Sequence, residues 1–182
     1  CSPGADCANV LDKTIGVKKF VNDISLSDAQ IDTIARWVDA GAPLGDPKDM
    51  PPPKVWPSDE VWQLAATERR QPDLTVKSTP WTQPAQGQDQ WWKPSVPSGM
   101  TEDRWIKAVE VRPSLKGRRI VHHGNSALAE FAVGKAGEIY PENTGKLLKA
   151  GQMVSFDIHY HSVGEEITDQ LEVGVWFYPK GY

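Results

Sequence analysis

The sequence predicts a mostly β protein, an antiparallel β-sandwich or jelly roll, with a short helical segment near its N-terminus. Short runs such as VSFDIHY and EVGVWFY alternate hydrophobic and polar positions, wholly or nearly, at period two. Clusters of turn residues separate these runs, with no helical period between them. The chain also contains 15 Pro and 15 Gly, which favour loops and short strands over long helices.

The first expected element is an amphipathic helix within residues 25–43. Ser27 and Gln30 have the spacing of a capping box, in which each side chain accepts from the other residue's backbone N–H. The apolar positions that follow lie on one helical face: Ile31, Ile34, Ala35 and Val38. Gly41 is suited to the C-terminal cap, and Pro43 prevents the helix from continuing.

Three parts are expected along the chain: a helical segment over 1–44, a Pro-rich linker over 45–59 and the β-sandwich over 60–182. The linker is predicted to be extended and semi-rigid because of its prolines. Four strand-like runs stand out in the third part: 104–113, 118–123, 153–162 and 171–179.

The composition indicates which broad classes of protein are expected and which are not. An apolar fraction of 39%, a charged fraction of 24% and a net charge of −4 suit a soluble globular protein. No basic stripe appears, so nucleic acid is not an expected partner, and no apolar run approaches the roughly 20 residues of a membrane span. Eight Trp residues are expected mainly in core and interface packing. A sugar-binding platform that includes Trp91 and Trp92 is the alternative.

The only cysteines are Cys1 and Cys7. A disulfide between them is plausible in an oxidising compartment, which favours a periplasmic or extracellular protein. Cys1 followed by Ser also fits a processed bacterial lipoprotein, anchored to a membrane through a lipid on Cys1. A fragment boundary explains the N-terminal Cys equally well.

All four histidines occur in two short motifs, IVHHGNS and FDIHYHS. His159 and His161 are two residues apart in a predicted strand, so their side chains share a face. His122 and His123 are adjacent, so both reach one ion only if the strand ends, twists or bulges there. Gly124, the next residue, makes such a break in the strand credible. Imidazole clusters suit Cu, Zn or Ni, whereas Ca and Mg prefer oxygen ligands.

Two readings of these histidines remain open: a metal centre, or titrating surface and hydrogen-bonded core residues. Their clustering favours metal. Asp157 is on the same predicted face as His159 and His161, so it is a candidate hydrogen-bond partner of a ligand, or else a solvated surface charge.

The pattern resembles the copper type II, ascorbate-dependent monooxygenases, relatives of peptidylglycine α-hydroxylating and dopamine β-monooxygenase. The resemblance covers roughly residues 57–182. It is carried by VHH at 121–123, YPENTGKLLKAGQMVSFDIHYHSVGEE at 140–166, VGVWFYPKG at 173–181, TEDRWIKAVEVRP at 101–113 and VGKAGEIYPE at 133–142. In that family two jelly-roll domains each hold one copper. The first domain's copper transfers electrons, and the second domain's copper, held by H-x-H and Met, binds dioxygen and hydroxylates a C–H bond.

The resemblance implies that His122, His123 and His159 are the copper ligands. His161 forms an H-x-H pattern with His159, but it lies inside the first domain, so it is interpreted as a spare residue or one that supports a ligand. Met153 is assigned to the core. No oxygen-binding second domain follows in this sequence, so the expected role is electron transfer.

Residues 16–53, from GVKKF to MPPP, resemble the final helix and tail of a c-type cytochrome module that is often fused upstream of such domains. Haem attachment requires C-x-x-C-H, which this sequence does not contain. Haem c is therefore expected only with an upstream part.

The sequence thus predicts the electron-transfer half of a copper-dependent monooxygenase, periplasmic or extracellular. Its expected partners are a second copper domain or subunit and an electron donor such as ascorbate or a cytochrome. The alternative is a non-catalytic structural or binding module with a vestigial metal site.

Overall fold

The structure is a computed structural model and describes residues 25–55, 58, 60–135 and 137–182. The predicted disulfide pair, Cys1 and Cys7, lies outside these residues. The chain divides between Lys54 and Val55 into two units, a division that falls inside the Pro-rich segment.

The N-terminal unit contains α2 (Asp28–Asp39) and the short 3-10 helix η1 (Pro47–Asp49). The predicted helix and its capping box are confirmed, because the Ser27 side chain accepts from the Gln30 N–H and the Gln30 side chain accepts from the Ser27 N–H. Gly41 follows the C-cap with a φ of 85°. Among the described residues, no side chain of α2 is buried and no helix is long and apolar enough to cross a membrane.

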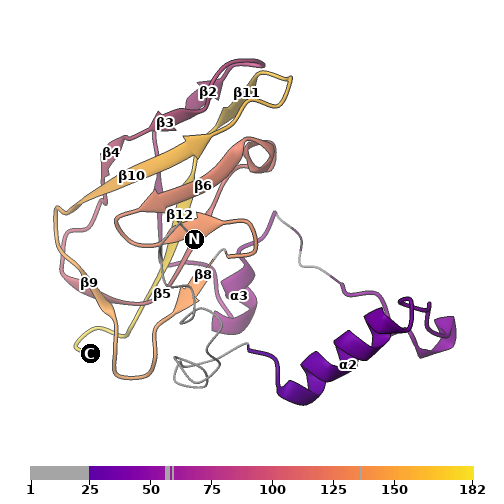
Figure 1. Cartoon of the computed structure of the whole chain (residues 1–182). Helices are drawn as coiled ribbons and strands as arrows, with labels where there is room; N and C mark the ends of the chain where they lie inside the picture. Colours follow the sequence, from indigo (N-terminus) through magenta and orange to yellow (C-terminus); the bar gives the residue numbers. More distant parts are fainter. Residues whose placement is uncertain (1–24, 56–57, 59, 136) are drawn as a thin grey trace, which may run out of the picture. The chain divides into compact units, whose positions relative to one another are not determined.

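In its described residues, the second unit contains the α-helix α3 (Gln63–Glu68), the 3-10 helix η2 (Gly117–Arg119) and strands that pair antiparallel throughout (Figure 1). The strands are β1 (Leu74–Lys77), β2 (Trp81–Gln83), β3 (Gln90–Trp92), β4 (Ser95–Pro97), β5 (Arg104–Arg112), β6 (Val121–Ser126), β7 (Glu130–Ala132), β8 (Gly137–Ile139), β9 (Lys146–Leu148), β10 (Met153–Tyr160), β11 (Ile167–Asp169) and β12 (Glu172–Phe177).

The strands form two five-stranded sheets and a two-stranded ribbon of β2 and β11. The first sheet has the order β1-β12-β5-β8, with β9 also on β5. The second has the order β3-β10-β6-β7, with β4 also on β10. This mostly β fold with antiparallel sheets is confirmed and fits a β-sandwich.

Three of the four predicted runs became β5, β10 and β12. The fourth, 118–123, is partly wrong: Arg118 and Arg119 belong to η2, and β6 begins at Val121 and continues to Ser126.

The main core receives side chains from both five-stranded sheets. Along β10, Val154, Phe156 and Ile158 are buried in it, so the alternate residues belong to the opposite face of that sheet. Met153 is 50% exposed, so its assignment to the core is wrong; it is the first residue of β10 and lies on the opposite face from Val154.

A second cluster covers the other face of the first sheet, where Trp62 and Trp176 pack with Ala108 near α3. The two indole rings meet edge to face, with centroids 6.2 Å apart. Trp burial is therefore confirmed for these two residues, whereas Trp91 and Trp105 are exposed.

Buried Asp169 anchors the loop before β6 to the end of β10. One carboxylate oxygen accepts the Ser114 N–H at 2.8 Å, and the other accepts the Tyr160 hydroxyl at 3.0 Å. Burial, followed by the charge of Asp169, raises the pKa of the Tyr160 phenol. Tyr160 therefore acts as a neutral hydrogen-bond donor that fixes the backbone between two of the histidines.

Glu110 of β5 provides the N-terminal cap of α3, because Trp62 at the N-cap has no side-chain oxygen to offer. The carboxylate of Glu110 is 1% exposed and accepts the N–H groups of Gln63 at 3.0 Å and Leu64 at 2.8 Å. A side chain from a distant strand thus satisfies two helix donors.

We predict that Glu110→Ala lowers the free energy of unfolding by about 1–3 kcal/mol, because two N–H groups lose a charged acceptor. Urea denaturation monitored by Trp fluorescence measures this change. The exposed Glu166→Ala variant is the control and should change stability by less than about 0.5 kcal/mol. Equal stability of the two variants would contradict the capping role.

Candidate metal centre

An irregularity in the pairing of β6 with β10 places the adjacent histidines on one face. His123 lies opposite His159, and Val121 lies opposite Tyr160, so His122 is an extra residue in the ladder. Such a β-bulge allows two neighbouring side chains to leave the same side of a strand. Of the three possibilities that the adjacent pair left open, a strand end, a twist or a bulge, the structure has the bulge.

The histidines lie on the outer face of the second sheet. Val121 and Gly124, which flank the pair in β6, are buried, as are Ile158 and Tyr160 on either side of His159 in β10. The bulge thus keeps the core-facing residues of β6 in place while His122 and His123 both point outward.

The three rings are close enough to serve one ion. One ring nitrogen from each of His122, His123 and His159 lies within 4.8 Å of the other two. The Nδ1 atoms of His122 and His159 are 3.1 Å apart. Two nitrogens that each lie ~2.0–2.1 Å from a tetrahedral ion are separated by about 3.3 Å. His122 and His159 already have nearly this spacing, and with His123 the three residues could hold a metal.

Exposure differs among the three histidines. His159 is only 8% exposed, whereas His123 is half-buried and His122 is exposed. Trp91 of β3 covers His159, with ring centroids 4.3 Å apart and planes within 8°. Trp91 itself is 53% exposed. One candidate ligand is thus rigidly enclosed, and another faces solvent.

Asp89 connects His159 with His161. Its Oδ2 lies 2.7 Å from Nε2 of His159, and its Oδ1 lies 2.6 Å from Nδ1 of His161. Hydrogen bonds from His161 and then from His159 hold the pKa of the Asp89 carboxyl below its usual value. A carboxylate only accepts, so the bonded nitrogens are donors, and the Nδ1 lone pair of His159 is left for an ion.

The sequence indicated Asp157 as the candidate carboxylate partner of a ligating histidine. In the structure, Asp157 lies beside Lys93, with Nζ 2.8 Å from its Oδ2, and Asp89 is the carboxylate that contacts the imidazoles. Asp89 is 70 residues from His159 in the sequence and reaches it only because β3 pairs with β10. The only local signal was its position directly before the QWW strand.

Gly124 is not the site of the break in the strand, contrary to expectation. It pairs regularly with Ile158, and the bulge lies before it, at His122. A Cβ at Gly124 would lie 2.9 Å from Cδ2 of Leu171, so the glycine permits a close approach of β6 to the core.

His161 lies outside the group of three. It follows the end of β10, its backbone N–H donates to the Ile120 carbonyl at 2.8 Å, and its side chain is 63% exposed. Its imidazole shares Asp89 with His159, so it lies next to the candidate centre without joining it.

An open hollow of about 420 Å³ adjoins the histidines and is lined by Asp89, Arg118, Arg119, His122, His161 and neighbouring apolar residues. Arg119 forms an ion pair with Glu165 at its edge. The exposed side of the centre is therefore accessible to small molecules.

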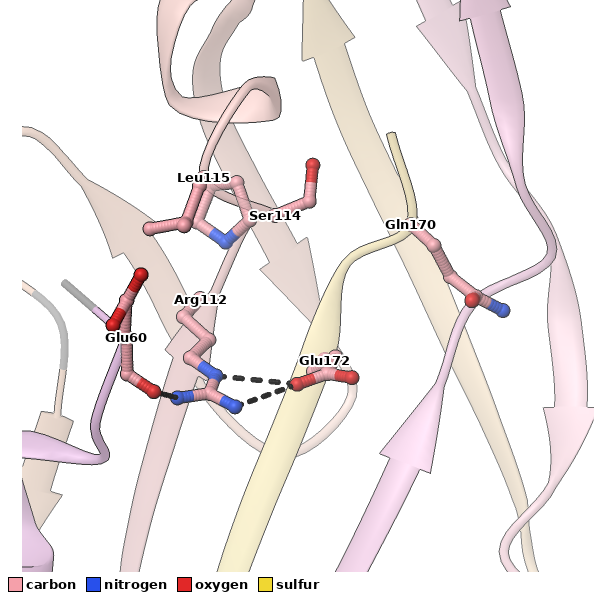
Figure 2. Close-up of a pocket in the computed structure, with 7 residues that line it drawn as sticks. Glu60, Arg112, Ser114, Leu115, Gln170 and Glu172 are labelled. Atoms are coloured by element: carbon pink, nitrogen blue, oxygen red, sulfur yellow. Dashed lines mark hydrogen bonds and ion pairs between the residues drawn. The ribbon is translucent and has the colours of Figure 1, made fainter. Parts of the chain in front are cut away.

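A second hollow, of about 280 Å³, lies around Arg112 (Figure 2). Two nitrogens of Arg112 donate to Glu172 at 3.2 and 3.0 Å, the third donates to the Glu60 carbonyl, and the guanidinium covers Trp62. Lys77 binds the other oxygen of Glu172. Arg112 and Lys77 both pair with Glu172, so we assign a structural role to this group of charges.

No family model matches the chain, and no curated protein matches it either. The candidate centre therefore rests on the residues and their geometry.

We predict that Gly124→Ala destabilises the protein by about 1–3 kcal/mol, because the new methyl group overlaps Leu171. Leu171→Val removes the overlapping atoms, so the double variant should be less destabilised than the sum of the single variants. Urea denaturation of the three variants measures this coupling. Strictly additive effects would contradict the close approach.

Proposed function

We propose that the sandwich binds one copper ion through His122, His123 and His159 and is the electron-transfer half of a copper-dependent monooxygenase. The observation that carries the proposal is the gathering of three imidazoles on one sheet face by the bulge at His122. Three neutral nitrogen donors fit a late transition metal and do not suit Ca or Mg.

Copper is preferred among such metals because of the resemblance of residues 57–182 to the copper type II monooxygenases. The ligands that this resemblance implies are the same three residues that form the cluster, and His161 is outside both sets. The jelly-roll arrangement of the strands is part of the same proposal.

Copper bound here would supply one-electron chemistry, since imidazole ligands support both of its common oxidation states. His159, enclosed by Trp91 and Asp89, provides a fixed donor. His122 is exposed beside the open hollow, so an electron donor can approach it closely. Hydroxylation of a substrate requires a second copper domain or subunit, and the donor is ascorbate or a cytochrome, in the periplasm or outside the cell.

One observation favours the alternative of a vestigial binding module. The Nδ1 atoms of His122 and His159 are within hydrogen-bond distance of each other, so the rings can satisfy one another without an ion. A metal ion would then have to replace the hydrogen bond between His122 and His159.

We predict that the purified protein binds about one equivalent of Cu(II) with the EPR spectrum of a type II site. The double variant His122→Ala/His123→Ala should lose this copper because only one of the three donors remains. Asn125→Ala, a neighbour in β6 outside the cluster, should bind copper like the wild type. Elemental analysis and EPR measure both. A double variant that retains its copper would contradict the assignment.

We further predict that ascorbate without oxygen abolishes the Cu(II) EPR signal and that air restores it, because a functional electron-transfer site cycles between two oxidation states. Copper retention through the cycle is measured by elemental analysis. A site that stays Cu(II) in excess ascorbate, or that releases its metal on reduction, would support the vestigial module instead.

A further inference from the structure

We propose that Asp89 is a positioning residue of the metal centre and that His161 acts on the metal only through Asp89. This inference rests on the proposed function, because it assigns roles around the same centre. It concerns two residues outside the group of three histidines. The resemblance to the monooxygenases gives no role to Asp89, and it leaves His161 open between a spare residue and one that supports a ligand.

Asp89 selects the tautomer of His159. A neutral imidazole has one N–H and one lone pair, and the partner of one nitrogen decides which nitrogen is available for metal. Asp89 Oδ2 lies 2.7 Å from Nε2, so the proton is on Nε2 and the lone pair is on Nδ1. Nδ1 is the atom that lies 3.1 Å from His122 Nδ1, on the side of the candidate centre.

Asp89 and Trp91 together fix the orientation of the His159 ring. Trp91 lies opposite His159 in the β3–β10 ladder and stacks on it with planes within 8°. Asp89 immediately precedes β3, so one short strand delivers both the stacked indole and the carboxylate at the ring edge. Stacking limits tilt, and the hydrogen bond limits rotation about the side-chain bonds. Together they hold Nδ1 ready for an ion.

His161 contacts Asp89 from the solvent side. Its side chain is 63% exposed, and its Nδ1 lies 2.6 Å from Oδ1 of Asp89. The carboxylate itself is 34% exposed and therefore has space to rotate. With one oxygen held by His161, the other is directed at His159. The contribution of His161 is thus indirect and smaller than that of Asp89.

The experiment measures Cu(II) affinity by competition with a chromophoric chelator, together with EPR hyperfine splitting. We expect Asp89→Ala to weaken Cu(II) binding about 10–100-fold, as is typical when the hydrogen-bond partner of a ligating histidine is removed. The splitting should change as well, because the orientation of His159 relaxes. Asp157→Ala is the matched control: this carboxylate lies in β10, the strand of His159, but pairs with Lys93, so affinity should not change.

His161→Ala should weaken binding less than Asp89→Ala does. In the Asp89→Ala background it should have no further effect, because the residue through which it acts is missing. Additive losses in the double variant would show that His161 contacts the metal itself and would overturn the proposal. Equal affinity of Asp89→Ala and wild type would overturn it too.

Two further measurements keep the outcomes distinct. Far-UV circular dichroism establishes that each variant is folded, and Asp89→Asn, which retains one acceptor oxygen, should recover part of the affinity and of the wild-type EPR spectrum if it is Asp89 that orients His159. If wild-type protein binds no Cu(II), the proposed function itself fails. If it binds Cu(II) through the three histidines and Asp89→Ala is unchanged, only the positioning role fails.

Discussion

A single unpaired position in the β6–β10 ladder determines where the histidines lie. Strand geometry sends adjacent side chains to opposite faces, so in a regular ladder either His122 or His123 would enter the core. With His122 as an extra residue, both rings point outward, while Val121 and Gly124 keep their buried positions. The bulge therefore reconciles an adjacent His pair with an intact sandwich core, and the rest of the centre is built around it.

On the outer face of the second sheet, the candidate ligands differ in how closely other side chains enclose them. His159 is enclosed by an indole and a carboxylate from the neighbouring strand, whereas His122 stands beside an open hollow. In the proposed copper site, one fixed donor and one accessible donor would suit electron exchange, because the ion would be held firmly and still be open to close approach. The buried Tyr160–Asp169 hydrogen bond holds the backbone beneath this arrangement.

Local sequence patterns sufficed for much of this picture. Period-two alternation identified β10 and β12, and the capping-box spacing identified α2. The adjacency of His122 and His123 indicated a strand end, a twist or a bulge if both were to reach one ion, and the structure has a bulge. Two of the expectations that failed depended on distant partners. Asp89 reaches His159 only through the pairing of β3 with β10, and Gly124 is explained by Leu171, which lies far along the chain. No window of a few residues contains such information, since both contacts arise from tertiary packing.

The most direct test of the account is a crystal structure of the copper-loaded protein with anomalous scattering at the copper edge. The account predicts one copper peak bound by Nδ1 of His122, Nδ1 of His159 and a ring nitrogen of His123, with Asp89 still on Nε2 of His159. A peak coordinated by His161 or by the Asp89 carboxylate, or copper bound away from the bulge, would contradict it.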